Sequence, residues 1–130
     1  MKKLYILVGV VTVAVLAAGG LLLVHGNSNA TNSCNAPTKS RHYTAVITEG
    51  KVTGDHIVGK LCDSLTITNR DNVSREIAFG PHEDHVPYDG VAERVLNKGQ
   101  SLTVTFNQTG SFHWHDHLHD EIEGFFAVSK

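Results

Sequence analysis

Sulfur-containing residues are scarce in this chain of 130 residues, which has two cysteines and one methionine. The methionine is Met1, so no methionine sulfur is available to a site in the rest of the chain. The cysteines are Cys34 and Cys62, and in an oxidising compartment we expect them to form a disulfide. A free thiol that ligates a metal ion is the alternative.

Basic residues are also few. Without Lys2 and Lys3, 9 basic residues face 13 acidic ones, a net charge of −4 with neutral histidines. A nucleic-acid partner would require a basic surface, so this balance argues against DNA or RNA binding. The negative charge weakly favours cations as partners.

Charge is absent from the segment Leu4 to Val24, which follows two lysines. A helix of this length, rising about 1.5 Å per residue, crosses a hydrocarbon core of about 30 Å. We therefore expect a transmembrane anchor over residues 1–24, with the lysines in the cytoplasm and the rest of the chain outside it. A cleaved signal peptide, which would leave a secreted protein, is the alternative.

Apolar residues are sparse from 25 to 41, where Asn, Ser, Thr, Ala and Pro predominate. This composition is typical of a flexible tether. The folded domain is then residues 42–130, which is long enough for one small core.

Helical periodicity is missing from this domain, and short segments with period two replace it. Ser64–Asn69 and Ser101–Phe106 alternate apolar and polar side chains, and turn residues separate the segments at regular intervals. Seven or eight such segments predict an all-β fold, an antiparallel Greek-key sandwich or barrel. The predicted strands are 42–48, 56–60, 64–69, 75–79, 93–96, 101–106, 111–115 and 124–128.

Histidine is plentiful, with nine residues, and six of them fall in two short stretches that contain five candidate metal ligands. His82 and His85 belong to "FGPHEDHVPYDGV", whereas His115, His117 and His119 belong to "FHWHDHLH". Alternate residues of a strand project side by side, so His115 and His117 are suitably spaced for chelation.

If the two stretches meet, these five imidazoles form one metal pocket. Asp116, and Glu83 as a further candidate, would serve as oxygen ligands or as acceptors that orient an imidazole N–H. This ligand set suits Cu(II), with Zn(II) or Ni(II) as competitors. Because neutral imidazole is the ligand, binding should fail below about pH 6.5.

Two stretches resemble the cupredoxin superfamily. "GQSLTVTFNQTGSFHWHDHLH…GFFAV" is similar to its closing strands and ligand loop, and "CDSLTITNRDNVSREIAF" to the strand and loop before its first ligand histidine. The resemblance covers about Cys62 to Val128. It implies a Greek-key β-sandwich that holds a metal at one end.

The resemblance also places the superfamily's ligand positions on this chain. The thiolate position falls on Asp116, the second histidine on His119, and the first histidine near Arg75, whose guanidinium has no lone pair to donate. Cys62 begins the strand that ends at Asn69, roughly 20 Å away, and cannot replace the thiolate. A blue-copper site is therefore excluded. Superfamily members with a similar loop carry a histidine pair there, and their last motif can read His-Asp-His.

These observations predict a membrane-tethered, extracytoplasmic, cupredoxin-like protein that binds copper through a histidine-rich, non-blue site. Its role would be metal holding or delivery, with electron transfer as a lesser option because soft ligands for Cu(I) are missing. The alternative is a metal-free structural or interaction domain. We do not expect an enzyme, because a lone domain without a cysteine-bearing relay cannot assemble a trinuclear copper cluster.

Overall fold

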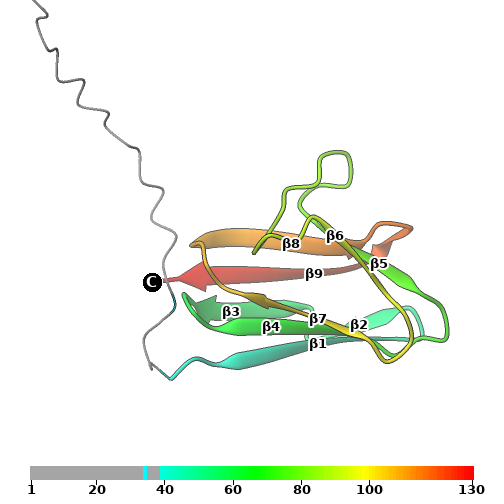
Figure 1. Cartoon of the computed structure of the whole chain (residues 1–130), viewed down its shortest axis with the longest axis horizontal. Coiled ribbons are helices and arrows are strands. Elements are labelled where there is room, and N and C mark those ends of the chain that lie inside the picture. Colours follow the sequence, from blue (N-terminus) through cyan, green and yellow to red (C-terminus); the bar gives the residue numbers. More distant parts are fainter. Residues whose placement is uncertain (1–33, 35–38) are drawn as a thin grey trace, which may run out of the picture.

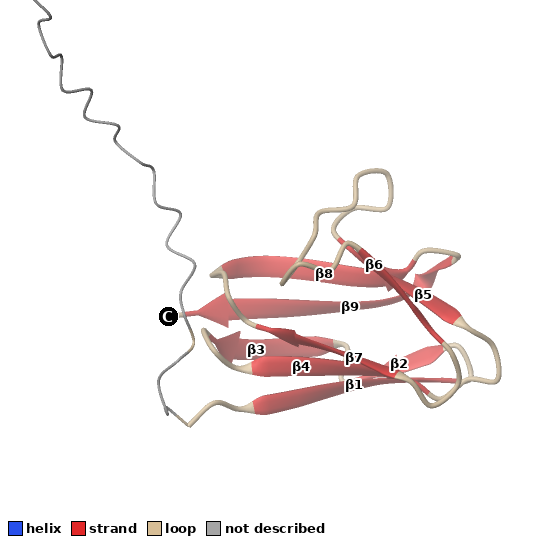
Figure 2. Cartoon of the chain, in the orientation of Figure 1, coloured by secondary structure: helices blue, strands red, loops and turns tan. Residues whose placement is uncertain are grey.

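The computed structural model describes Cys34 and residues 39–130. Within these residues the chain forms nine strands and no helix, arranged as two sheets that pack face to face (Figure 2). None of this described part forms a helix long and apolar enough to cross a membrane. The predicted anchor, residues 1–24, and most of the predicted tether, residues 25–41, lie outside the described residues.

The first sheet has the strand order β2-β1-β4-β7 and the second the order β3-β9-β8-β5-β6. The strands of the first sheet are β1 (His42–Thr48), β2 (Lys51–Thr53), β4 (Ser64–Asn69) and β7 (Ser101–Thr105). Those of the second are β3 (His56–Lys60), β5 (Arg75–Phe79), β6 (Glu93–Leu96), β8 (Gly110–Asp116) and β9 (His119–Ser129).

The all-β sandwich predicted from the sequence is confirmed, but its pairing is not antiparallel throughout. β1 pairs with β4 in parallel, and β3 pairs with β9 in parallel. The chain leaves the first sheet after β2, adds β3 to the other sheet and then returns as β4. This crossing between the sheets makes β1 and β4 run in the same direction. Strand β2, which has only three residues, was not among the predicted strands.

Aromatic residues fill the space between the sheets. The rings of Phe106 and Phe126 stack with centroids 5.1 Å apart, and Trp114 is 1% exposed. Trp114 lies opposite Gly124 in the β8–β9 pair, where a Cβ atom would come within 2.6 Å of the indole ring. A glycine is therefore required at 124, because a side chain there would overlap the buried indole ring of Trp114.

The two ends of the sandwich differ in what they carry. At one end Cys34 and Cys62 form a disulfide, and the neighbouring Leu61 amide donates a hydrogen bond to the Ser129 carbonyl oxygen of β9. At the other end lies the turn that joins β8 to β9 (Figure 1).

Candidate metal centre

Strand β8 presents histidines on the outer face of the five-stranded sheet. Trp114 points into the core, and side chains alternate along a strand, so His113 and His115 project outward. His117 follows in the β8–β9 turn. The loop between β5 and β6 brings His82 and His85 over the same face, and the ring of His82 lies 5.5 Å from that of His115.

Four of these imidazoles converge on one point. His82, His85, His115 and His117 each offer a ring nitrogen, and these four nitrogens lie within 4.8 Å of one another. His85 Nε2 and His117 Nδ1 are 3.2 Å apart. Two nitrogens bound at about 2.0 Å to one tetrahedral ion would be separated by roughly 3.3 Å. The four rings, which we call the histidine cluster, are therefore close enough together that they could hold a single metal ion.

His115 gives the clearest sign that the cluster requires a ligand. It is 1% exposed, and neither of its ring nitrogens has a hydrogen-bond partner. A buried polar group without a partner is costly, and a metal ion would satisfy the one nitrogen to which it binds. Burial lowers the pKa of His115, and the nearby His113, His85 and His82 lower it further. The ring is thus held neutral, the form that donates a lone pair to a metal.

Carboxylates orient the two histidines of the loop. His82 Nδ1 lies 2.9 Å from Asp120 Oδ1, and His85 Nδ1 contacts Glu93 Oε1. In both rings Nε2 is left for the metal, as in carboxylate–histidine–metal arrangements. Neither Asp120 nor Glu93 was among the predicted site residues. Asp120 follows His119 directly, which was a usable signal, whereas Glu93 lies in β6 and only the sheet pairing brings it near.

A bulge places Asp120. His115 pairs with Glu123 and Asp116 pairs with His119, so residues 120–122 of β9 have no partner on β8. Such extra residues bend a strand and redirect side chains. The bend carries the Asp120 carboxylate to His82 while Ile122 stays in the core at 2% exposure.

Asp116 and His119 lie outside the histidine cluster. Asp116 is fully buried, and its carboxylate accepts hydrogen bonds from Arg75 Nη1 at 3.0 Å and from the Glu76 amide at 3.1 Å. His119 Nδ1 is 3.3 Å from Asp116 Oδ2. The cause is strand alternation, because residue 116 points to the face opposite His115. The structure thus does not bring these two members of the expected ligand set to the other four.

Arg75 and Asp116 nevertheless meet at the end of the sandwich, as the aligned ligand positions of the cupredoxin resemblance imply. Arg75 also pairs with Asp71 at 2.6 Å, and all three side chains are buried. Burial alone would raise the pKa of Asp71, but hydrogen bonds from Arg75 and from the amides of Gly50 and Glu49 hold it below its ordinary value. We call Asp71, Arg75 and Asp116 the ionic cluster.

His113 is not available as a ligand in this arrangement. Its Nδ1 lies 3.2 Å from the Gly80 carbonyl oxygen and its Nε2 lies 2.9 Å from Glu123. Its ring stacks on His115 with centroids 5.2 Å apart. His113 therefore supports the position of His115 from the side.

Neither a protein-family model nor a curated protein matches this chain. Several solved structures do. A purple cupredoxin from Nitrosopumilus maritimus is 18% identical with a TM-score of 0.58, covering 67% of this chain and 99% of that one. A reduced mutant of amicyanin is 18% identical with a TM-score of 0.56, covering 74% and 89%.

A copper-containing nitrite reductase from Thermus scotoductus is 13% identical with a TM-score of 0.55, covering 68% of this chain and 22% of that one. At these identities the comparisons concern the fold. The chain has a cupredoxin-like fold, as the sequence motifs predicted.

Proposed function

We propose that this protein is a membrane-tethered, extracytoplasmic copper-binding protein that holds Cu(II) in the histidine cluster. Its role is metal holding or delivery rather than catalysis, with electron transfer as the lesser option. The observation that carries the proposal is the convergence of four imidazoles around His115, whose two nitrogens are buried without partners.

The ligand chemistry favours copper. Imidazole nitrogen suits Cu(II), Zn(II) and Ni(II), and Cu(II) has the highest affinity in the divalent series. The structural neighbours add support, because one is a copper-containing nitrite reductase and others are Cu(I) forms of amicyanin mutants. Zn(II) remains the main competitor, since four imidazoles also satisfy a tetrahedral zinc ion.

The surroundings of the cluster favour holding and delivery. The His82 side chain is 41% exposed, so an ion can enter and leave without the core opening. Thiolate and thioether ligands, which stabilise Cu(I), are not part of the cluster. A centre without them binds the oxidised ion more tightly, which makes electron transfer the weaker option.

The tether is proposed from the sequence. The uncharged segment Leu4 to Val24 would hold the domain at the outer side of a membrane, and cleavage would release it instead. The Cys34–Cys62 disulfide supports an extracytoplasmic location, because disulfides persist in oxidising compartments.

The decisive experiment is Cu(II) titration of the metal-free full chain against a competing chelator, with His115→Ala beside His119→Ala. We expect one tightly bound ion, and a loss of affinity of about 100-fold or more in His115→Ala because a ligand is removed. His119→Ala is the matched control from the same segment, and its affinity should stay within about 3-fold of the wild type. Equal affinities in all three proteins would contradict the proposal.

The alternative is a metal-free interaction domain. The ionic cluster motivates it, because a charge pair lies where the cupredoxin resemblance places metal ligands. In that case neither copper nor zinc raises the melting temperature of the full chain, either in the wild type or in His115→Ala.

A further inference from the structure

The loop between β5 and β6 carries two carboxylates that pair with no other group. Glu83 and Asp84, which we call the acidic pair, lie between the cluster ligands His82 and His85, and both are exposed. Neither side chain makes a hydrogen bond or an ion pair within the described part of the chain. The carboxylates that orient His82 and His85 are paired, so the acidic pair differs from them in having no contact to maintain.

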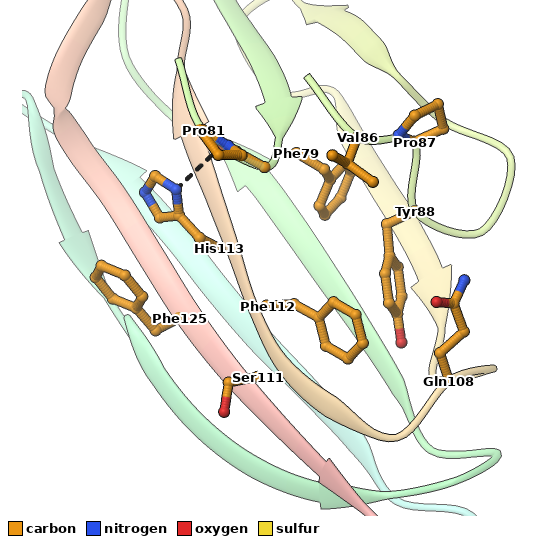
Figure 3. Close-up of a pocket in the computed structure, with 11 residues that line it drawn as sticks. Phe79, Pro81, Val86, Pro87, Tyr88, Gln108, Ser111, Phe112, His113 and Phe125 are labelled. Atoms are coloured by element: carbon orange, nitrogen blue, oxygen red, sulfur yellow. Dashed lines mark hydrogen bonds between the residues drawn. The ribbon is translucent and has the colours of Figure 1, made fainter. Parts of the chain in front are cut away.

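Backbone contacts hold this loop in place without help from the acidic pair. The Asp84 amide donates a hydrogen bond to the Pro81 carbonyl oxygen at 3.1 Å, which closes a turn. The Gly80 carbonyl oxygen lies 3.2 Å from Nδ1 of His113 in β8, a contact drawn as a dashed line in Figure 3. The loop should therefore keep its shape when the two carboxylates lose their charge.

Both segments that build the histidine cluster are acidic. Residues 76–93 contain five acidic residues and residues 107–129 contain four, and neither segment contains a lysine or an arginine. The basic residues that flank the first segment are Arg75, which is buried in the ionic cluster, and Arg94. Like charges gathered around one site create a negative potential that raises the local concentration of cations. The field around the histidine cluster thus favours the approach of a cation over that of an anion.

His115 indicates where a captured cation would go. Its ring lies 5.5 Å from that of His82 and 5.3 Å from that of His85, so it faces both ends of the acidic pair. It is 1% exposed, and neither of its nitrogens has a hydrogen-bond partner. The acidic pair therefore lies beside buried nitrogens that lack a ligand, with the exposed side chain of His82 between them and solvent.

We propose that the acidic pair captures hydrated Cu(II) and speeds its entry into the histidine cluster. This inference rests on the proposed copper function and adds the form in which the metal arrives, which is a hydrated dication rather than an anionic chelate. An exposed charge attracts the ion before any imidazole binds it, so the acidic pair acts on the association rate. The imidazole ligands set the release rate.

Trp114 provides the signal for the test. It is the only tryptophan of the chain and it precedes His115, so bound Cu(II) should quench its fluorescence. Stopped-flow mixing of the metal-free full chain with Cu(II) in a weakly coordinating buffer gives the association rate. Near 0.01 M ionic strength, Glu83→Gln with Asp84→Asn should slow association by about 5-fold. In 1 M salt, where the Debye length is about 3 Å, the two rates should agree within about 1.5-fold.

Two control variants separate capture from other effects of the carboxylates. Glu83→Asp with Asp84→Glu keeps both charges but moves each carboxylate, and it should take up and release Cu(II) as the wild type does. A changed release rate would instead indicate that Glu83 is a ligand, against the proposal. Glu49→Gln with Asp55→Asn removes the same charge from exposed positions outside the two acidic segments, and its association rate should stay within about 1.5-fold of the wild type.

An anionic source of copper should respond in the opposite direction. The complex of Cu(II) with nitrilotriacetate is negatively charged, so neutralising the acidic pair should leave its reaction as fast as in the wild type or faster. A slower reaction would show that the acidic pair does not act through its charge.

The outcomes distinguish this inference from the copper proposal. Quenching that is equally strong in His115→Ala would overturn both, because the ion would not be in the histidine cluster. Three results would overturn this inference alone while quenching still depends on His115. They are an unchanged association rate when the acidic pair is neutralised, an equal slowing in the Glu49 and Asp55 control, and a slowing that persists in 1 M salt.

Discussion

The ionic cluster and the histidine cluster are neighbours in sequence but differ in how their polar groups are satisfied. Asp116 is fully buried, and four groups of the chain lie within hydrogen-bonding or ion-pairing distance of it. The ring of His115, the preceding residue, is also buried, and neither of its nitrogens has a hydrogen-bond partner. Groups that the fold satisfies by itself serve stability, and groups that it leaves unsatisfied call for a ligand. The contrast assigns a structural role to one cluster and a binding role to the other.

Removing Asp116 should have the largest effect on folding. Asp116→Ala leaves Arg75 buried with only Asp71 as a charged partner, and breaking a buried pair costs about 3–5 kcal/mol. Urea denaturation of the metal-free full chain measures this loss. Arg75→Met combined with Asp116→Leu should recover most of it, because well-packed apolar residues replace such pairs at little cost. A loss below about 1 kcal/mol in Asp116→Ala would show that the ionic cluster is not structural.

The same experiment on the histidine cluster should give the opposite result. His82→Ala with His117→Ala removes two ligands and should weaken Cu(II) binding by about 1000-fold. The free energy of unfolding without metal should change by less than about 1 kcal/mol, since both side chains are partly exposed. Chelator competition and urea denaturation provide the two measurements. A large loss of stability with unchanged copper affinity would reverse the roles of the two clusters.

Removing a carboxylate behind the histidine cluster should have a smaller effect. Asp120→Asn keeps the side-chain size but weakens the contact with His82, and such changes reduce metal affinity by about 10-fold. Glu121→Gln, one position along β9, removes the same charge from the neighbouring position and is the control. If both substitutions weaken binding equally, only the overall negative charge matters, and the orienting role of Asp120 is wrong.

The smallest expected effect is on the pH dependence of stability without metal. Burial lowers the pKa of His115, so the folded chain keeps this ring neutral where the unfolded chain binds a proton. Stability contributed by the neutral ring is therefore lost as pH falls below the ordinary histidine value of about 6.5.

Denaturation of the wild type and of His115→Leu at several pH values between 7 and 5 tests this effect. As pH falls, the free energy of unfolding should decrease less steeply in the variant. The two slopes against pH should differ by up to about the amount expected for one proton bound on unfolding. The pairs of His82 with Asp120 and of His85 with Glu93 are present in both proteins, so the difference isolates His115. Parallel pH profiles of the wild type and His115→Leu would contradict a lowered pKa of His115 in the folded chain.

Local pattern in the sequence was sufficient for most of the fold. Ser64–Asn69 and Ser101–Thr105 alternate in burial as their sequences predict, because period two places every second side chain in the core. The parallel pairing of β1 with β4 was not predictable in this way. It depends on where the chain crosses between the sheets, which no local pattern encodes.

The candidate site was predictable only in part. The pairs His82 with His85 and His115 with His117 were identifiable from their spacing, and the structure brings them together. The alternation of side chains along a strand predicted that Asp116 points to the face opposite His115. The cupredoxin resemblance nevertheless favoured Asp116 as a ligand position. Glu93 was not assigned, since its contact with His85 across the β5–β6 loop appears only once the chain is folded.

The β8–β9 hairpin has arms of unequal length, so the number of residues in its longer arm can change without disturbing the paired part of the hairpin. Residues 120–122 stand outside the ladder, so pairs of residues can be added or removed there without inverting the faces of the rest of β9. Such changes would decide which acidic side chain reaches His82 while Trp114 and Gly124 keep the sandwich intact. If the histidine cluster binds a metal ion as proposed, a change in loop length would alter the metal preference with the four histidines themselves untouched.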